Sequence, residues 1–362
     1  MDRLDHQGNP FLSHAFLSGL ERSGSIGPAI GWQPHHLALY ENDELVAFAP
    51  SYIKTNSHGE FVFDWAWADA YHRNRLPYYP KLLTAVPYSP VTGMRLLTRQ
   101  GHDEAELLRR RLILLAQEQC SEHEFSSWHC NFVSSDHQSL EASGLLARSD
   151  WQFHWQNPGY STFDDYLAKL RSRKRKNVRR ERRMVADAGI TFEWKSGEEL
   201  DTADLGFIHS CYKSTFHAYG NSPVLSQSFF EIIAREMKAR VQVSFAHCNG
   251  QRVAMSFFLT GGGRLYGRYW GCISEFPGLH FEAAYYQGIE YCIRSGINVF
   301  ESGAQGEHKV ARGFLPTKTR SYHFVENPVF REAIADFLSR ETQWLDDYRD
   351  ELMKHSPFRR DE

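Results

Sequence analysis

The sequence predicts an α/β protein composed of two similar halves, and three observations support this fold class. The 362 residues, of which 42% are hydrophobic and 14% aromatic, can supply the cores of two domains. Strand-like and helix-like segments follow one another in the same order in each half. Val46–Ala47 and Val253–Ala254 occupy matching positions after turns that contain Asn42 and Asn249.

The first half combines helices with hairpin-forming strands. Its predicted elements are a helix over 10–24, strands over 35–41, 44–54 and 59–68, a helix over 104–120 and a strand over 126–133. Asn42–Asp43 and the sequence NSHG are typical of the turns between antiparallel strands. Apolar residues at helical spacing predict the helix over 104–120.

The second half repeats this order. Residues 241–271 predict three strands joined by turns, 281–296 a helix, and 297–302 a strand. Between the halves, Ser161 or Thr162 is expected to cap a long helix that Gly189 ends. We therefore expect an N-terminal domain over 1–160, a basic connecting helix over 161–190, a C-terminal domain over 191–328, and an amphipathic helix within 329–362 that packs on the body.

Three segments resemble the proteobacterial FemAB-like family of N-acyltransferases. They are LYGRYWGC at 265–272, the long motif LHFEAAYYQGIEYCIRSGINVFESGAQGEHKVARGFLP at 279–316, and KNVRRER at 176–182. The resemblance extends over nearly the whole chain. That family groups with the GNAT acyltransferase fold and with the Fem peptidyltransferases of cell-wall synthesis. The resemblance implies two tandem GNAT-like domains, each with a mixed, mostly antiparallel sheet flanked by helices.

The chemistry of such an enzyme sets requirements of its own. An amine attacks an acyl thioester or ester directly, so the protein must align two substrates, remove a proton and stabilise an oxyanion. No serine or cysteine lies in a nucleophile motif, which argues against a covalent intermediate. The six cysteines show no zinc-site spacing, so we expect a metal-independent enzyme.

The loop after the strand over 297–302 carries the leading site candidates. Glu301 and His308 are predicted to transfer protons, since a carboxylate and an imidazole can both act as bases. The glycines of this loop allow tight turns whose peptide N–H groups can bind a carbonyl oxygen or an anion. The two cations can bind phosphate or carboxylate. The residues predicted to bind substrate are Gly303, Gln305, Gly306, Lys309 and Arg312. The alternative is a polar loop closed by its own ion pairs.

The strand within LYGRYWGC is the second candidate region. Period-two alternation places Tyr266, Arg268 and Trp270 on one side, as a wall that binds an anion between flat rings. Alternatively, the aromatics belong to the core and the arginine pairs with an acid. The segment also partly matches the acyl-CoA pyrophosphate signature Gln/Arg-x-x-Gly-x-Gly/Ala. Ile273 occupies the last position, and this departure weighs against CoA as donor.

Four further ionisable residues are secondary candidates. His280 and Glu282 begin the helix over 281–296, where substrates often bind, although Glu282 can instead satisfy the helix dipole. In the first half, Asp64 and Asp69 are candidates for lining a crevice between the domains. Capping or ion pairing explains these two aspartates equally well.

Residues 169–183 form a basic run in which ten of fifteen residues are Lys or Arg and Glu181 is the sole acid. Three interpretations remain open. The run could form a solvated helix, a nucleic-acid-binding surface, or a basic wall beside a substrate that carries phosphate. The wall would consist of Arg173, Lys174, Lys176, Arg179 and Arg180.

Together these features predict an N-acyltransferase. We expect it to be cytoplasmic, because no signal peptide or membrane span is apparent in the sequence. The donor would be acyl-CoA or an aminoacyl-tRNA used as co-substrate, with no tightly bound cofactor. The acceptor would be a small-molecule or nucleotide-linked amine, with peptidoglycan metabolism and the oligomeric state left open. The alternative is a noncatalytic RNA- or DNA-binding protein that uses 169–183, although a net charge of −3 is unusual for that class.

Overall fold

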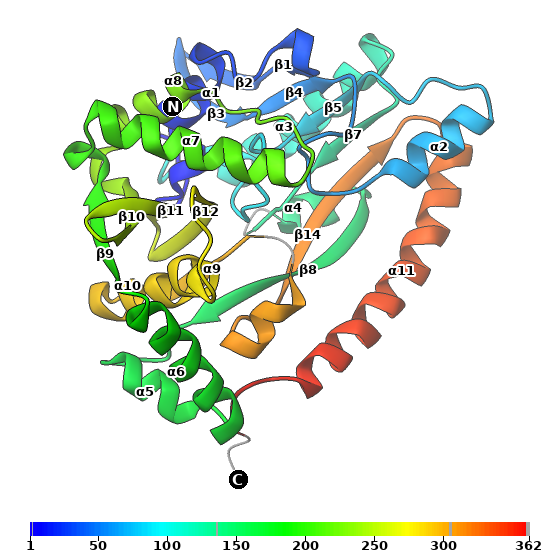
Figure 1. Ribbon diagram of the computed structural model, residues 1–362. Coiled ribbons are helices and arrows are strands. Elements are labelled where there is room, and N and C mark those ends of the chain that lie inside the picture. Colours follow the sequence, from blue (N-terminus) through cyan, green and yellow to red (C-terminus); the bar gives the residue numbers. More distant parts are fainter. Residues whose placement is uncertain (2, 135–136, 304–305, 360–362) are drawn as a thin grey trace. The chain divides into compact units, whose positions relative to one another are not determined.

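The chain folds into two compact units in the computed structural model, which describes residues 1, 3–134, 137–303 and 306–359 (Figure 1). The first unit comprises Met1–Leu17, Ile26–Trp151 and Lys318–Arg349. The second comprises Ser18–Ser25, Gln152–Thr317 and Asp350–Glu362. Each unit therefore contains segments that are distant in the sequence.

The first unit contains a five-stranded and a three-stranded sheet. Their orders are β1-β4-β5-β7-β14 and β2-β3-β6, and the described pairs are antiparallel except β5 with β7. The strands are β1 Trp32–Pro34, β2 Leu37–Glu41, β3 Glu44–Ala49, β4 Ser51–Lys54, β5 Lys81–Thr84, β6 Leu97–Thr98, β7 Ser127–Cys130 and β14 Leu315–Val325. The helices are α1 His14–Arg22, which crosses into the second unit, α2 Trp65–Arg73, α3 Ala105–Glu122, α4 His137–Glu141 and α11 Pro328–Lys354, with short 3-10 turns at Pro10–Leu12 and Pro28–Ile30.

Helix α3 forms the centre of the first unit's core. Its buried residues Leu108, Leu112 and Ala116 recur every four positions and so lie on one face. They pack against Ala47 of β3 and Trp128 of β7, one from each sheet. The predicted helix over 104–120 and the strand over 126–133 are thus confirmed.

The predicted strand over 59–68 is wrong, because this segment leads into helix α2. Phe61 adopts a φ of 60°, which is incompatible with an extended strand. Trp67 and Tyr71 are four residues apart and both buried, so the aromatic residues here follow the helical period. They pack with Ile334 and Leu338 of α11 in one apolar cluster.

The second unit is built on one mixed sheet of order β8-β13-β12-β11-β10-β9. All its pairs are antiparallel except β12 with β13. The strands are β8 Leu146–Gln156, which begins in the first unit, β9 Ile190–Ser196, β10 Val241–Cys248, β11 Gln251–Gly261, β12 Arg264–Cys272 and β13 Val299–Glu301. The helices are α5 Phe163–Lys169, α6 Ser172–Asp187, α7 Thr202–Ala218, α8 Gln227–Met237, α9 Leu279–Phe281, a π-helical segment Glu282–Tyr286 and α10 Gln287–Ser295, with 3-10 turns at Gly197–Glu199, Lys238–Arg240 and Glu307–Arg312. The predicted fold class, mixed sheets flanked by helices, is confirmed.

The two hairpins that suggested a duplication share their local geometry. Asn42 and Asp43 have φ of 50° and 64°, and Asn249 and Gly250 have φ of 51° and 77°. Both turns therefore have the left-handed backbone that two-residue hairpins prefer. A register shift lies two residues before each asparagine. The turn chemistry predicted from the sequence is confirmed in both halves.

The basic connecting segment is two helices and not one. Leu170 is fully buried and forms a β-bridge with Phe358, which ends α5. Arg171 has an extended backbone and donates its N–H to Pro357 at 2.8 Å. The Thr162 cap and the stop at Gly189 occur as expected, with φ of 71° at Gly189.

Candidate active site

A β-bulge in β12 positions the candidate site. Phe258 pairs with Gly267 and Phe257 with Tyr269, so the register shifts by one residue and Arg268 is the extra residue of the bulge. An extra residue of this kind interrupts side-chain alternation along a strand. Tyr269 accordingly packs against Tyr212 of α7, with ring centres 5.0 Å apart.

Because of the bulge, the predicted wall of Tyr266, Arg268 and Trp270 is not one face. A Cβ on Gly267 would lie 3.1 Å from the Phe300 ring, on the side of α10, and the Trp270 ring is 5.3 Å from that of His280 in α9. Gly267 and Trp270 thus face the same helices, and Tyr266 faces away from them. Period-two reasoning failed here since it assumes a regular strand.

An opening lies between β12 and the residues that follow β13. The two parallel strands pair only from Arg264–Val299 to Tyr266–Glu301, after which β12 continues to Cys272. A cavity of about 90 Å³ occupies this place, and its lining includes Arg268, Trp270, His280, Tyr285 and Ser302. A pocket of about 480 Å³ shares Trp270 and His280 with it. The second volume is in the range of small-molecule sites.

His280 and Tyr285 line this opening, and His308 adjoins it through Tyr285. The Tyr285 hydroxyl is 3.0 Å from Nε2 of His308, and the rings of His280 and His308 are 6.4 Å apart. Desolvation, together with the nearby His308 and Arg312, lowers the pKa of His280 to about 4. Partial desolvation and the charges of Arg312 and Lys309 also lower the pKa of His308. Both imidazoles are therefore neutral near pH 7, as a base must be.

The two cations of the loop are committed to the protein itself. Lys309 is 4% exposed, and its ammonium donates to the carbonyls of Ser302 and Gly303, each at 2.9 Å. Burial lowers the pKa of Lys309 to about 7. Arg312 is 7% exposed and contacts His308 and Glu181. These side chains hold the loop in place and do not point at a free anion.

Glu301 is separated from the imidazoles. It is 4% exposed, and its carboxylate is 2.7 Å from the Arg264 guanidinium and 3.9 Å from Nε2 of His154. Successive strand residues point to opposite faces, so Glu301 faces away from Phe300 and its helix-side neighbours. The structure thus brings His308 and His280 together but not Glu301.

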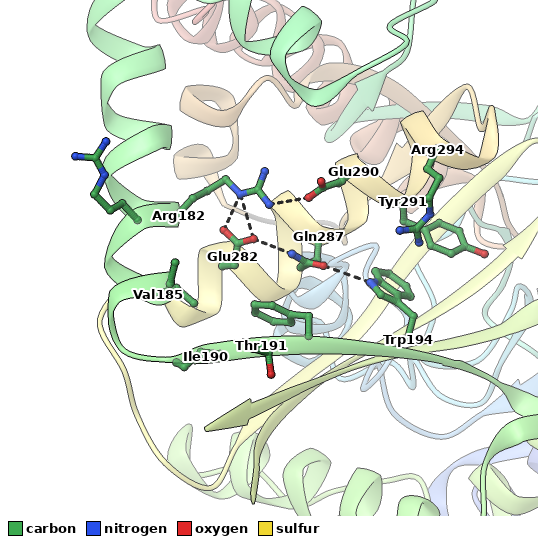
Figure 2. Close-up of a pocket in the computed structure, with 13 residues that line it drawn as sticks. Arg182, Val185, Ile190, Thr191, Trp194, Glu282, Gln287, Glu290, Tyr291 and Arg294 are labelled. Carbon is green, nitrogen blue, oxygen red and sulfur yellow. Dashed lines mark hydrogen bonds and ion pairs between the residues drawn. The ribbon is translucent and has the colours of Figure 1, made fainter. Parts of the chain in front are cut away.

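Glu282 lines a different pocket, of about 610 Å³, beside α6 (Figure 2). Arg182 donates to both oxygens of Glu282 at 3.2 Å and to Glu290 at 2.6 Å. Gln287 links Glu282 to Trp194 through further hydrogen bonds. Burial raises the pKa of Glu282, although Arg182 opposes this shift. Its carboxylate is held in this network and does not face the opening at β12.

The two candidate aspartates lie in the first unit in different surroundings. Asp64 is 1% exposed and pairs with the Lys81 ammonium, while the Tyr78 hydroxyl donates to it at 2.5 Å. Asp69 is exposed on α2. Asp64 is therefore engaged in a buried ion pair with Lys81.

The basic residues of α6 divide between two faces. Val178 and Val185 are buried, and Val185 packs in one apolar cluster with strand residues. Glu181 and Arg182 pair with residues of the second unit. The solvent face carries a row spaced three and four residues apart, namely Arg173, Lys176, Arg180 and Arg183. Of the other two predicted wall residues, Lys174 is half-buried and Arg179 pairs with Asp164 at 3.2 Å.

The glycines of the candidate region have separate structural reasons. Gly303 and Gly306 have φ of 91° and 120°, which only glycine adopts readily, as predicted for tight turns. Gln305 lies outside the described residues. A Cβ on Gly271 would be 2.0 Å from the Cys211 carbonyl oxygen, so packing on α7 requires this glycine. The glycine of the apparent pyrophosphate signature is thus explained without a cofactor.

Sequence reasoning missed Tyr285, Ser302 and Phe281. Tyr285 is one of two consecutive tyrosines in a helical pattern, and such residues usually belong to the core. It is indeed 4% exposed, and only its hydroxyl reaches His308. A tyrosine near a histidine in space has no signal in the sequence.

Two searches of the described parts of the chain gave negative results. No group of three or more His, Cys, Asp or Glu side chains is arranged to hold a metal ion there. None of the described helices combines the length and the apolar character needed to cross a bilayer.

Comparisons with known proteins agree with the resemblance found in the sequence. A model of the FemAB-like family, described as peptidoglycan biosynthesis/recognition, matches residues 1–360. Comparison with curated proteins finds no match. The family match confirms the predicted resemblance and the predicted class of enzyme, an acyltransferase.

Solved structures support the fold. FemX aligns with a TM-score of 0.56 at 12% identity, over 91% of this chain and 96% of FemX. L-PGS from Bacillus licheniformis aligns with a TM-score of 0.52 at 10% identity, over 90% and 97%. A conserved protein of unknown function from Bacteroides thetaiotaomicron VPI-5482 aligns with a TM-score of 0.51 at 12% identity, over 88% and 92%. At these identities the likeness concerns the fold alone.

Proposed function

Since the chain belongs to the FemAB-like family, we propose that it is a cytoplasmic N-acyltransferase that passes an activated acyl group directly to an amine. The reaction takes place in the opening between β12 and the residues after β13. The observation that carries this proposal is that His280 and Tyr285 line that opening and that His308 contacts both of them beside it.

The substrates follow from the family and from the size of the site. The donor is acyl-CoA or an aminoacyl-tRNA, used as co-substrate and not held between turnovers. The acceptor is a small-molecule or nucleotide-linked amine. The family's description favours an acceptor of peptidoglycan type. The 480 Å³ pocket next to Trp270 offers room for one of the two reacting groups.

His308 acts as the base in this proposal. An amine must lose a proton before it can attack a carbonyl, and His308 is exposed and has a lowered pKa. In the tautomer that donates Nε2–H to the Tyr285 hydroxyl, Nδ1 keeps a lone pair for that proton. Tyr285 thereby orients the imidazole.

The backbone of β12 stabilises the oxyanion in this proposal. The pairing of β12 with β13 ends at Tyr266–Glu301, and we assign oxyanion stabilisation to the β12 backbone that borders the opening beyond this pair. Aligning the two substrates supplies a further part of the rate enhancement. No covalent intermediate is needed.

A thermal-shift screen identifies the substrate before kinetics. Acyl-CoAs, nucleotide sugars and amino compounds are added singly, because a ligand that binds only the native state raises Tm by mass action. Acyl transfer between the stabilising donor and acceptor is then measured by mass spectrometry. If no stabilising pair yields an acylated amine, the proposed function is wrong.

Replacement of His308 tests the base. His308→Gln keeps an N–H for Tyr285 but cannot take up a proton, so kcat should fall by about a hundredfold or more. His217→Gln, at the exposed end of α7, is the matched control and should be neutral.

The pH profile gives an independent readout of the base. In the wild type, kcat/KM should fall as the pH drops through the pKa of His308, below the usual 6.5. His308→Gln should lose this acid limb. Wild-type turnover by His308→Gln would exclude His308 as the base.

A further inference from the structure

The one acid of the basic run faces the protein and not solvent. The Glu181 side chain is 19% exposed, and its Oε1 is 2.8 Å from Nη2 of Arg312. Its Oε2 accepts a hydrogen bond from the hydroxyl of Tyr286, which is fully buried. The Glu181 carboxylate therefore pairs toward the protein interior, although basic residues surround it on α6. A solvated charged helix would not require such a contact.

Arg312 connects Glu181 to the backbone of His308. Its Nη1 donates to the His308 carbonyl at 2.9 Å, and its guanidinium lies 3.4 Å from the centre of the Phe281 ring. The Tyr166 hydroxyl donates to the Arg312 carbonyl at 2.9 Å. The Arg312 guanidinium is therefore one of the groups that hold the turn carrying His308, and Glu181 is bonded to that guanidinium.

The position of the Arg312 guanidinium depends on the negative charge of Glu181. Arg312 is 9% exposed at its side chain, and Glu181 is the acid to which it is bonded. Removing one member of a buried pair leaves an uncompensated charge, which is strongly unfavourable. Without Glu181 the guanidinium would turn toward solvent and release the His308 carbonyl.

We propose that Glu181 is a positioning residue, which acts through Arg312 to hold the His308 imidazole at the opening beside β12. This inference rests on the proposed function, in which His308 takes the proton from the amine. It also gives the basic run a role other than binding a polyanion. Its acid links α6 to the turn Glu307–Arg312.

A neighbouring ion pair provides a matched control. Arg182, next in the chain, pairs with Glu290 at 2.6 Å and so also ties α6 to the body of the second unit. Glu290 has no hydrogen bond or ion pair with the turn Glu307–Arg312 among the described contacts. Glu290→Gln therefore removes a similar tie to the same helix without affecting His308.

The kinetic test is a double-mutant cycle. Glu181→Ala and Arg312→Met should each lower kcat by about ten- to a hundredfold, because a small misplacement of a reacting group is costly. KM should stay within about twofold if only the proton-transfer step is affected. The double variant should be no slower than Arg312→Met alone, since Glu181 acts only through Arg312. Glu290→Gln should retain wild-type kcat.

Additive effects on kcat in the cycle would overturn the proposal. So would equal losses in Glu181→Ala and Glu290→Gln, since these would point to a general effect of loosening α6. Glu181→Gln, which keeps the shape of the side chain, should fall between wild type and Glu181→Ala.

A readout without turnover separates this inference from the proposed function. The His308 ring signals are followed by NMR during a pH titration of the full-length protein. In Arg312→Met the pKa of His308 should rise toward its ordinary value, because a nearby positive charge is removed. In Glu181→Ala the ring signals should shift, and in Glu290→Gln they should not.

The two failures are then distinguishable. If His308 responds to Glu181→Ala but His308→Gln remains active, positioning holds and the assigned base is wrong. If His308→Gln is inactive but the His308 ring signals do not shift in Glu181→Ala, the proposed function stands and Glu181 has no positioning role.

Discussion

Four ionisable side chains lie buried together in the first unit. Lys81 contacts Asp64 and is 2.8 Å from Glu60, and Lys54 is 3.9 Å from Glu60. Burial raises the pKa of Glu60 and lowers that of Lys54, each to about 7. Burial alone would raise the pKa of Asp64, but the Lys81 ammonium holds it well below its usual range. Asp64 thus stabilises the fold as an anion.

Asp64→Asn should lower the free energy of unfolding by about 3 kcal/mol, because Lys81 loses its closest partner in a buried site. Asp69→Asn, on the exposed side of the same helix, should change it by less than about 0.5 kcal/mol. Urea unfolding near pH 7 measures both. Equal effects of the two substitutions would show that burial of Asp64 does not decide its role.

The pH dependence of this difference has a definite sign. The pKa of Asp64 is lower in the folded than in the unfolded state, so its contribution to stability is complete above the unfolded value of about 4. It is lost as the pH falls through the folded value. The difference between wild type and Asp64→Asn should therefore shrink only below about pH 4.

Single residues also explain the mixed outcome for the predicted site. His308, His280, Arg268 and Trp270 were chosen by chemical type and by family motif, and they do line or adjoin one opening. Glu301 was chosen on the same grounds and is paired with Arg264 instead. Residue type tells which side chains can do chemistry, but not toward which face of a strand each one points.

At the scale of elements, β12 shows how packing sets backbone requirements. It lies against α7, where a Cβ on Gly271 would meet the Cys211 carbonyl oxygen. The same strand contains the bulge at Arg268, which redirects its side chains toward α9 and α10. A regular β12 would place Trp270 on the other face and remove it from the opening.

Gly271→Ala should destabilise the protein by about 1–3 kcal/mol, because the added methyl group forces β12 away from α7. Gly206→Ala is the matched control within α7 itself. A Cβ there meets nothing within 4 Å, so alanine should be neutral or stabilise by up to about 1 kcal/mol. Thermal unfolding compares the two, and a neutral Gly271→Ala would contradict the packing described here.

At the scale of the whole molecule, charge is distributed unevenly. The net charge is −3, yet the solvent face of α6 presents a row that includes Arg173, Lys176 and Arg180. This row lies opposite the face through which Glu181 reaches Arg312. The basic run thus contains a solvated side and a side anchored to the second unit.

Reversal of Arg173, Lys176 and Arg180 to Glu should leave acyl transfer from a donor without nucleic acid unchanged within about twofold, since exposed substitutions rarely disturb the fold. Any polynucleotide binding should weaken and lose salt dependence, because fewer phosphates are neutralised. Filter binding and the transfer assay measure the two properties. A folded variant that fails to turn over would place the row in the catalytic site.

The sequence by itself determined the fold class, the family, the hairpin turns at Asn42 and Asn249 and some of the helices, among them α3 and α11, because these depend on local periodicity and turn chemistry. Only the tertiary structure decided that 59–68 leads into α2 and that α5 and α6 separate at Leu170. It also decided that Glu301 and Glu282 point away from the opening, beside which His280 and His308 lie. Each of these outcomes depends on contacts between residues distant in the sequence. A residue's chemical type is local information, whereas its direction and its partner are set by packing.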